Sequence, residues 1–399
     1  MINALPAVLI GGPPQAGKSV LFYRLTQALR EQGIDHYALR ACPDGEGNWF
    51  HEGEPDLVST LRVKLTGEWP PTFIQSISQA LEHRSLPFLV DMGGRPKASQ
   101  ECLLRGCTHS ILLVREDKPE DTLLWENLVE THNLLPLGRF ISRLTGESII
   151  TAESPVLEGV FTGLERNMAH ANAGAGPLFD ELLRRISALF ASYDLQELRA
   201  LHLQQAPTEL TLDIQQELRV FTTASVKWEP AMLPQLLERL PKQVPLSVYG
   251  RGPGWLYAAL AAYEDPQPFY LFDPKVPFGW ISPVRVSLED KPRQLEEMQL
   301  KMTNAQAFTN LQISLPNDRL EYLQPEPLPF PKVSLERGLV IDGRVPYWLL
   351  TSLTRLYKAA GVPWIASFYV PLGKAVVVYS AMKDYQPGDL VDRPGFYEQ

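Results

Sequence analysis

The feature that most constrains the fold is a glycine-rich segment near the N-terminus with the spacing G-x-x-x-x-G-K-S. It runs from Gly12 to Ser19, as GPPQAGKS. The apolar run from Ala7 to Ile10 precedes it and predicts a buried strand, and apolar residues recur at helical spacing from Leu21 to Leu29. A strand, a glycine loop and a helix in this order place consecutive backbone N–H groups around a triphosphate. The segment therefore predicts an α/β domain that binds a nucleotide; the alternative is a chance match in an ordinary glycine turn.

The residue types of this loop predict individual roles. Lys18 would reach the β- and γ-phosphates, and the Ser19 hydroxyl would ligate Mg²⁺. We expect Lys18 to be exposed in the empty loop, where it contributes charge to the transition state rather than to the core. The predicted ATP-binding residues are Gly12, Pro13, Gln15, Ala16, Gly17, Lys18, Ser19 and Val20.

Asp91 is the second candidate Mg²⁺ ligand. It closes the apolar run that begins at Pro87, about seventy residues after the loop. An acid at this point of a nucleotide-binding domain holds Mg²⁺, usually through water. The alternative is an aspartate at a strand end that caps Gly93 or Gly94.

A polar segment from Leu39 to Trp49 follows the second predicted strand. Ligands of a doubly wound sheet bind at the carboxyl ends of its strands, so the segment is a candidate second-substrate site. Asp44 is the candidate base that accepts a proton from a substrate hydroxyl. The alternative is a polar turn with Trp49 packed on the core. Three arginines are candidates for neutralising phosphate charge in the transition state: Arg95, Arg115 and Arg166.

Composition and charge restrict the class of protein. The net charge of −9 argues against non-specific binding of duplex nucleic acid, which requires clustered Lys and Arg. Three cysteines without C-x-x-C spacing favour a reduced cytoplasmic setting over a disulfide framework. We expect no membrane segment, because no apolar run reaches the length that a membrane helix needs, and no signal peptide.

Residues 1–203 predict one domain with a parallel sheet and helices on both faces. The expected strands are 7–10, 34–39, 87–91, 110–114 and 155–161, and the expected helices beyond the one after the loop are 97–105, 119–132 and 178–200.

The C-terminal half repeats itself. Residues 246–256 return as 339–349, with Gly, Arg, Pro, Trp and Leu coinciding in register. We therefore expect an internal duplication. The predicted fold class is α/β, a P-loop NTPase/kinase-like domain followed by two small α+β domains, 208–288 and 308–399. A charged helix or linker at 289–301 would join them.

Each copy carries a Gly-Arg turn between a strand and a helix, Gly250-Arg251 and Gly343-Arg344. Free N–H groups at a helix start attract anions, so each turn is a candidate site for a phosphodiester. The alternative is structural, with Gly for the turn, Pro for the helix start and Trp255 or Trp348 for the core. All seven histidines precede residue 203, which predicts that neither copy uses histidine as base or metal ligand.

These copies resemble the small CRISPR-associated ring nuclease 3 domain, which binds and cleaves cyclic tetraadenylate as an oligomer. That family has G-R-x-P-x-W-L before a helix, then Y-D-P-R-L-G-G-A-V-V-V followed by S-H. The first copy keeps Gly250-Arg251, Pro253, Trp255-Leu256 and 272–275; the second keeps Gly343-Arg344, Pro346, Trp348-Leu349 and 371–378. The N-terminal part looks like the P-loop domain, often labelled AAA, that is fused to this nuclease in some bacteria.

Two departures from the family pattern matter. The nuclease domain comes first in the fused family members, whereas here the P-loop domain leads and two copies follow. The S-H pair is Ser380-Ala381 in the second copy and Ser282-Pro283 in the first. The missing histidines argue against metal-dependent ring cleavage and leave ligand binding open.

The sequence thus predicts a cytoplasmic accessory protein of type III CRISPR signalling that forms a homo-oligomer. It would hydrolyse or transfer the γ-phosphate of ATP with Mg²⁺, using Lys18, Asp44, Asp91 and Arg166, under control of a cyclic oligoadenylate. The first alternative is a non-enzymatic protein that binds the messenger, with a loop that only orders an oligomer. The second is an active ring nuclease whose base is a carboxylate such as Asp265 or Asp273.

Overall fold

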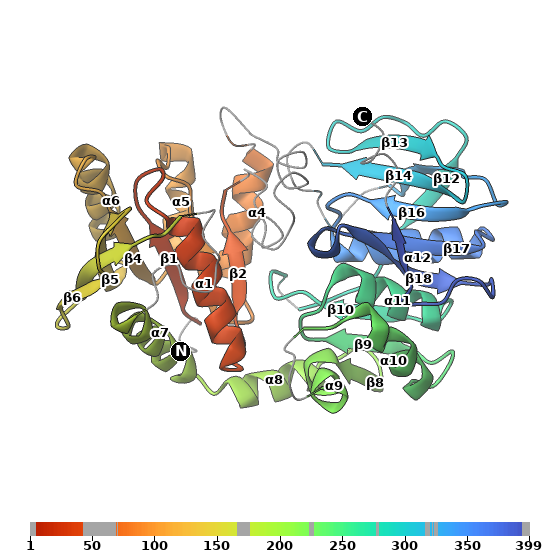
Figure 1. The fold of residues 1–399 in the computed structure, drawn as a ribbon, viewed down its shortest axis with the longest axis horizontal. Helices are drawn as coiled ribbons and strands as arrows, with labels where there is room; N and C mark the ends of the chain where they lie inside the picture. The colour runs from red at the N-terminus through yellow and green to blue at the C-terminus, as the bar shows by residue number, and fades with distance from the viewer. Residues whose placement is uncertain are drawn as a thin grey trace. The chain divides into compact units, whose positions relative to one another are not determined.

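The computed structural model describes residues 5–42, 69, 71–165, 176–222, 227–276, 279–315, 320, 322 and 326–392. These residues form two compact units (Figure 1). The first holds the described residues up to Leu201 together with the short segment Pro274–Gly279. The second holds the described residues of His202–Asp273 and those from Trp280 onward. No described helix has the length and apolar character to cross a membrane.

The first unit is built on a seven-stranded sheet of order β2-β3-β1-β4-β5-β7-β6. All neighbouring strands run parallel except β6, which is antiparallel to β7 at one edge. Its strands are β1 Ala7–Gly11, β2 Tyr37–Arg40, β3 Phe88–Asp91, β4 His109–Val114, β5 Leu135–Arg143, β6 Ile149–Ala152 and β7 Leu157–Thr162. Its helices are α1 Lys18–Glu31, α4 Pro71–Glu82, the 3₁₀ turn η1 Ala98–Gln100, α5 Cys102–Arg105, α6 Pro119–Thr131, α7 Pro177–Ala191 and most of α8 Leu195–Gln204.

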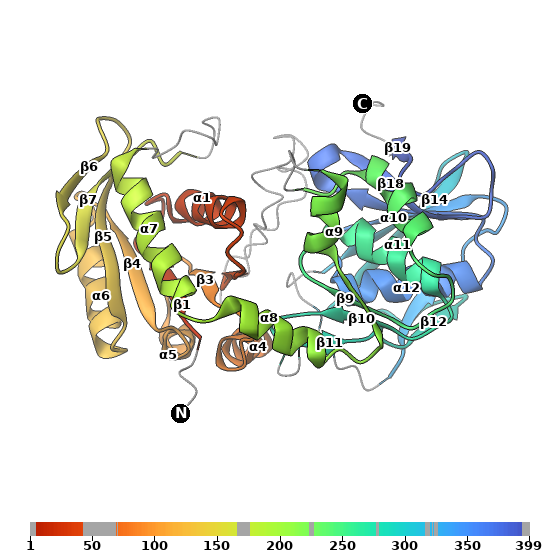
Figure 2. The ribbon, with the colours of Figure 1, turned by 90° about the horizontal axis from the view of Figure 1, so that it is seen from below.

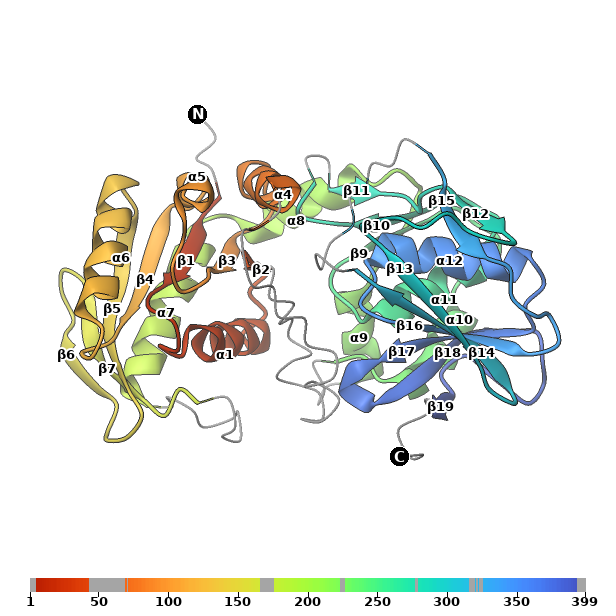
Figure 3. The ribbon, with the colours of Figure 1, turned by 90° about the horizontal axis from the view of Figure 1, so that it is seen from above.

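Helices cover both faces of this sheet (Figure 2 and Figure 3). One apolar cluster joins α1 and α7 to Val8 and Ile10 of β1, and the other joins α4, α5 and α6 to Ala7 and Leu9 of the same strand. Successive residues of a strand point to opposite faces, so a continuously apolar strand such as β1 serves both layers. The predicted parallel sheet with two helical layers is confirmed.

Several elements of this unit differ from the sequence prediction. Strands β5 and β6 and helix α4 were not expected. The helix expected over 178–200 is two helices, because the Asp194 carboxylate accepts a hydrogen bond of 2.9 Å from the Glu197 N–H and starts α8 as a new helix. The sequence did not predict β5 because this strand is partly exposed and contains polar residues, including Arg139 and Arg143.

The second unit holds two further sheets. One has the order β11-β10-β9-β8 and the other the order β13-β14-β16-β17-β18-β19; β12 and β15 form a separate parallel pair. The strands are β8 Leu210–Asp213, β9 Leu246–Tyr249, β10 Phe269–Phe272, β11 Trp280–Ile281, β12 Val286–Glu289, β13 Gln299–Asn304, β14 Phe308–Ser314, β15 Leu328–Pro331, β16 Gly338–Asp342, β17 Trp364–Tyr369, β18 Lys374–Ser380 and β19 Leu390–Asp392. The helices are α9 Ile214–Phe221, η2 Pro230–Met232, α10 Leu233–Arg239, α11 Gly254–Glu264, α12 Tyr347–Ala359 and the 3₁₀ turn η3 Val370–Leu372.

The two copies share one topology. β8, β9 and β10 run parallel and β11 runs antiparallel to β10; β14, β16 and β17 run parallel and β18 runs antiparallel to β17. Helix α11 connects β9 to β10 as α12 connects β16 to β17. This equivalence supports the duplication seen in the sequence.

The copies pack on each other within the second unit. Helices α11 and α12 lie side by side between the two sheets, and α11 also contacts β17 and β18 of the second copy (Figure 3). The charged stretch 289–301 was expected to be a helix or linker; it contains no helix, and residues 290–298 connect β12 to β13. Pro292 disfavours a helix interior there, because it lacks an N–H to donate.

Candidate functional site

The glycine loop leaves β1 and enters α1 in a conformation that only glycine accommodates. At Gly12 the φ angle is 141°, and a Cβ would lie 2.0 Å from the carbonyl oxygen of Leu113 on β4. At Gly17, which precedes α1, φ is 79° and a Cβ would lie 2.5 Å from Cβ of Leu164. The two glycines therefore allow the loop to pass closely between neighbouring segments. Gln15 at the loop tip is exposed, whereas Ala16 and Val20 are buried in the core beneath it.

Lys18 is folded into the loop. Its ammonium donates hydrogen bonds to the carbonyl oxygens of Gly12 and Pro13 at 2.9 and 2.7 Å. The residue is only 7% exposed, so the expectation of an exposed lysine is wrong. These carbonyl oxygens accept the hydrogen bonds that oxygens of a bound phosphate could accept instead.

Ser19 and Asp91 come together at the carboxyl end of the sheet. The Ser19 hydroxyl donates to Asp91 Oδ2 at 2.9 Å. β1 and β3 are parallel neighbours, with Ile10 opposite Asp91, so the residues that follow β1 lie beside the end of β3. Asp91 is 1% exposed. A hydroxyl and a carboxylate are oxygen ligands of the kind that Mg²⁺ takes, and Mg²⁺ sites often use few protein ligands besides phosphate and water.

Arg40 is a third member of this cluster. It lies opposite Asp91 in the pairing of β2 with β3, and its guanidinium is 3.8 Å from Asp91 Oδ2. Its guanidinium carbon also lies 5.4 Å from the ring centroid of Phe22 on α1. Arg40 lies in the predicted second-substrate segment, but the sequence pattern predicted no role for it. Its position at the end of a predicted strand was the signal that could have found it.

Of the other residues predicted for this site, the structure describes Arg115 and Arg95. Arg115 donates to the carbonyl of Gln15 at 3.5 Å and pairs with Asp117 at 2.5 Å, which places it beside the loop. Arg95 is exposed and pairs with Asp121 on α6 at 2.5 Å. Asp44, with the rest of the second-substrate segment beyond Cys42, and Arg166 lie outside the described residues. Across the described parts of the chain, no three His, Cys, Asp or Glu side chains gather as a metal-binding group.

The two Gly-Arg turns occupy equivalent positions. Gly250 has φ 96° and Gly343 has φ 123°, each immediately after a strand. Pro253 and Pro346 are the N-cap residues of α11 and α12, one position before the first helical residue. In the second turn a Cβ at Gly343 would lie 2.0 Å from the carbonyl oxygen of Ile313, so glycine is required there.

The helices that follow the two turns pack on each other near their starts. A Cβ on Gly254 would lie 3.2 Å from Leu350 and 3.5 Å from the Tyr347 ring, which belong to the second copy. Tyr257 of α11 stacks on Tyr347 with ring centroids 4.9 Å apart and an interplanar angle of 26°. Trp255 and Trp348 are 1% and 5% exposed, which favours the structural alternative for both tryptophans.

One histidine reaches the first copy from outside it. His202 near the end of α8 contacts the Tyr249 hydroxyl through Nδ1 at 3.1 Å and packs on Phe272 with centroids 4.6 Å apart. His202 precedes the first copy in the sequence but lies beside Tyr249, which immediately precedes Gly250. Burial lowers the pKa of His202 to about 4, so the ring is neutral near pH 7.

Asp265 has a structural partner. Its carboxylate accepts a hydrogen bond of 2.8 Å from Arg355 Nε, and Lys358 Nζ is 3.9 Å away. These contacts join the end of α11 to α12. Asp273, the other candidate base, lies within electrostatic reach of Tyr257 together with Arg251.

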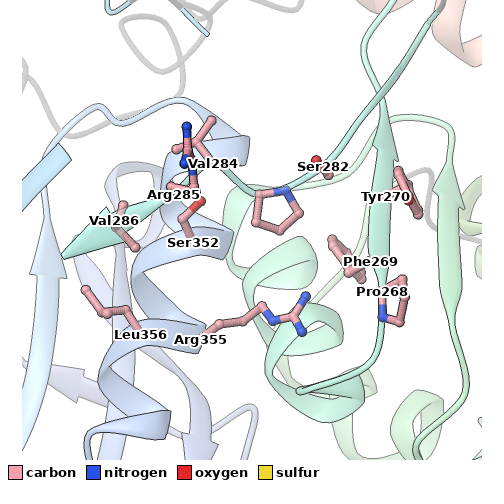
Figure 4. A pocket seen from close by; sticks show the side chains of 11 residues that line it. Pro268, Phe269, Tyr270, Ser282, Val284, Arg285, Val286, Ser352, Arg355 and Leu356 are labelled. Carbon is pink, nitrogen blue, oxygen red and sulfur yellow. The ribbon is translucent and has the colours of Figure 1, made fainter. Parts of the chain in front are cut away.

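Arg355 also lines a pocket of about 410 Å³ between the start of β10, the strand β12 and α12 (Figure 4). Its lining residues are Pro268, Phe269, Tyr270, Ser282, Pro283, Val284, Arg285, Val286, Ser352, Arg355 and Leu356. The pocket lies at the start of β10, whereas Gly250 follows the end of β9, which runs parallel to β10. The pocket and the first Gly-Arg turn are therefore at opposite ends of this sheet.

Comparison with known protein families gives a match within the second copy. Residues 313–392 match the model of a family described as CRISPR-associated protein (Cas_csx3). The match supports the prediction of a CRISPR-associated protein and includes Gly343 and Arg344, but it does not extend to the first copy or to the glycine loop. No curated protein matches the chain.

Among solved structures, the chain is similar to chloroplast FtsY from Physcomitrella patens, with 11% identity and a TM-score of 0.23. The similarity covers 35% of this chain and 50% of that one, so the chain spans about half the length of that protein. A TM-score of this size does not establish a common fold.

Proposed function

We propose that the chain is a CRISPR accessory protein that binds ATP at the glycine loop and turns it over, with a cyclic oligoadenylate bound at the Gly-Arg turns as its regulator. The observation that carries the proposal is the group formed by Lys18, Ser19 and Asp91. The Lys18 ammonium lies among loop carbonyls, and the Ser19 hydroxyl lies 2.9 Å from the buried Asp91 carboxylate. Phosphoryl transfer uses a lysine to bind the phosphates and a hydroxyl with a carboxylate to hold Mg²⁺.

The loop would hold the phosphates through its backbone. Its N–H groups and the start of α1 attract negative charge, and the glycines at 12 and 17 let the backbone approach closely. Lys18 would exchange the carbonyls of Gly12 and Pro13 for oxygens of the β- and γ-phosphates. That exchange replaces neutral acceptors by charged ones, which strengthens each hydrogen bond.

Ser19 and Asp91 would hold Mg²⁺, which supplies positive charge to the phosphate oxygens when bound. The donor set fits this ion, since both groups offer oxygen and Asp91 is already held in place by Ser19 and Arg40. Arg40 balances the charge of the buried carboxylate in the absence of a cation.

Asp44 remains the proposed base toward a second substrate, and Arg166 a proposed charge-neutralising group. Arg115 has a specific argument in its favour, because it already contacts the loop at Gln15. An arginine at this place would add positive charge near the transferred phosphoryl group.

The regulatory part of the proposal rests on the family match and on the two turns. The match to a CRISPR-associated family includes the second turn. The helices that follow the two turns, α11 and α12, pack on each other near their starts, so a ligand at the start of one helix is close to the start of the other. Asp265 is engaged by Arg355, which favours binding of the ring over its cleavage.

The test is ATP turnover by the purified full chain, with and without cyclic tetraadenylate, followed by chromatography of both nucleotides. The proposal expects phosphate release that depends on Mg²⁺ and changes with the ring, while the ring stays intact. Absence of turnover in the presence and absence of the ring would leave a non-enzymatic binding protein; accumulation of linear di-adenylate would mean a nuclease.

A further inference from the structure

The first Gly-Arg turn is hydrogen-bonded to a side chain of its own helix, α11. In the first turn the Tyr257 hydroxyl accepts a hydrogen bond of 3.0 Å from the Gly252 N–H. The same hydroxyl donates to the Gly250 carbonyl at 2.6 Å. Tyr257 is 2% exposed. A backbone N–H that a phosphodiester would use is therefore already satisfied from within the chain.

The aligned position of the second copy carries no hydroxyl. Tyr257 follows Trp255 by two positions, and the residue two positions after Trp348 is Leu350. A leucine side chain has no hydrogen-bonding group, so it cannot bond the second turn as Tyr257 bonds the first. Burial raises the pKa of Tyr257, so its phenol stays protonated and keeps its donor bond to Gly250.

The first turn is packed on a further side by α9. A Cβ on Gly252 would lie 2.8 Å from Cδ1 of Ile214, and one on Gly250 would lie 3.3 Å from Cγ of Gln215. Ile214 is fully buried. Arg251 is exposed, whereas Arg344 of the second turn is half-buried. The side chains near the two turns are therefore arranged differently despite the repeated sequence.

We infer that Tyr257 closes the first Gly-Arg turn, so that the chain recognises a phosphodiester of the cyclic oligoadenylate at the second turn alone. The inference rests on the proposed binding of that ligand and makes Tyr257 the residue that determines which turn is used. The family match, which includes Gly343 and Arg344 and stops short of the first copy, is consistent with this difference.

The test is calorimetric titration of the full chain with cyclic tetraadenylate. Arg344→Ala is expected to weaken binding at least tenfold, the usual effect of losing a hydrogen bond to a charged group. Arg251→Ala should change affinity by less than about twofold. The Tyr257→Phe variant frees the Gly252 N–H, so in that background Arg251→Ala should weaken binding by about threefold or more.

Tyr263→Phe is the matched control, since Tyr263 lies on the same helix and its hydroxyl bonds the Leu240 carbonyl at 3.2 Å, away from the turn. It should leave both arginine effects unchanged. Tyr257→Leu, which introduces the residue of the second copy, replaces Tyr257→Phe if that variant does not fold. The comparison of Arg251→Ala with Arg344→Ala is made in the wild-type background and requires no substitution of Tyr257.

The outcomes separate the inference from the proposed function. Equal losses in Arg251→Ala and Arg344→Ala would overturn the closed turn while binding at the repeats stands. Binding by the wild type that neither arginine affects would overturn both the inference and the proposed site. A loss confined to Arg251→Ala would reverse the assignment and overturn the inference.

Discussion

The Ser19 hydroxyl donates to the Asp91 carboxylate at 2.9 Å across 72 positions of the sequence. The contact arises because β1 and β3 are adjacent parallel strands, so the loop after one strand meets the end of the other. It brings a hydroxyl from the glycine loop to the acid of a separate apolar strand, and the predictions for the proposed nucleotide site follow from it.

Replacing Lys18 by Ala should abolish ATP turnover with little effect on folding. The variant loses the positive charge that stabilises the transferred phosphoryl group. It also loses two hydrogen bonds to loop carbonyls, so we expect a small decrease in the melting temperature. Phosphate release and a thermal melt measure the two effects, with Lys118→Ala at the start of α6 as control. Undiminished turnover would remove the loop from the mechanism.

The variants Ser19→Ala and Asp91→Asn should both raise the Mg²⁺ concentration needed for half-maximal turnover, by roughly tenfold or more, because each removes an oxygen ligand or its charge. Asp91→Asn should also destabilise the fold more than Ser19→Ala, since it leaves Arg40 beside a neutral group. A magnesium titration at saturating ATP measures the Mg²⁺ concentration that each variant needs for half-maximal turnover. An unchanged magnesium requirement in both variants would contradict the assignment.

If Asp44 is the base, Asp44→Asn should reduce turnover on the order of 10²-fold, with ATP affinity nearly unchanged. The reason is that a base acts in the transition state and contributes little to binding of the ground state. Steady-state kinetics and equilibrium nucleotide binding provide the two readouts. Equal losses of ATP binding and turnover would instead mean that Asp44 helps to bind Mg²⁺ or to stabilise the fold.

The variant Asp265→Asn should destabilise the second unit without creating or removing ring cleavage. Asp265 pairs with Arg355 in a partly buried contact between α11 and α12, so the change leaves the guanidinium without its charged partner. We expect a loss of about 1–3 kcal/mol in the free energy of unfolding. Denaturant titration measures it, and incubation with cyclic tetraadenylate, Mn²⁺ and Mg²⁺ checks the ring. Ring cleavage by the wild type that disappears in this variant would make Asp265 a catalytic base.

Stability should fall as the pH drops from about 6.5 toward 4. Burial lowers the pKa of both His36 and His202 to about 4, below that of an unfolded histidine. Between about pH 4 and pH 6.5 the unfolded chain binds more protons than the folded chain. Each histidine therefore lowers the free energy of unfolding by about 1.4 kcal/mol for each pH unit that the pH falls. Urea unfolding at pH 7 and 5 measures the effect. His202→Gln should reduce the pH dependence; an identical profile in that variant would rule His202 out as a contributor.

The sequence was sufficient for features that depend on local spacing. The apolar run at Ala7, the glycines at 12 and 17 and the helical spacing after Lys18 predicted the strand, loop and helix that the structure contains. The repeated Gly-Arg turns predicted two equivalent strand–helix units for the same reason. Strand β5 was missed because its side chains alternate irregularly and two of its arginines pair with acids outside the strand.

What the sequence determined by itself is the chemistry available: a glycine loop with a lysine and a serine, an acid at a strand end, and two copies of one turn. Only the tertiary structure decided which of these groups meet. The pairing of β2, β3 and β1 brought Arg40, Asp91 and Ser19 together, and the packing of α11 placed the Tyr257 hydroxyl in one turn while leaving leucine at the same position in the other. Periodicity fixes which face of an element is buried, but the partner of a buried polar group depends on strand order and helix packing, which local spacing does not encode.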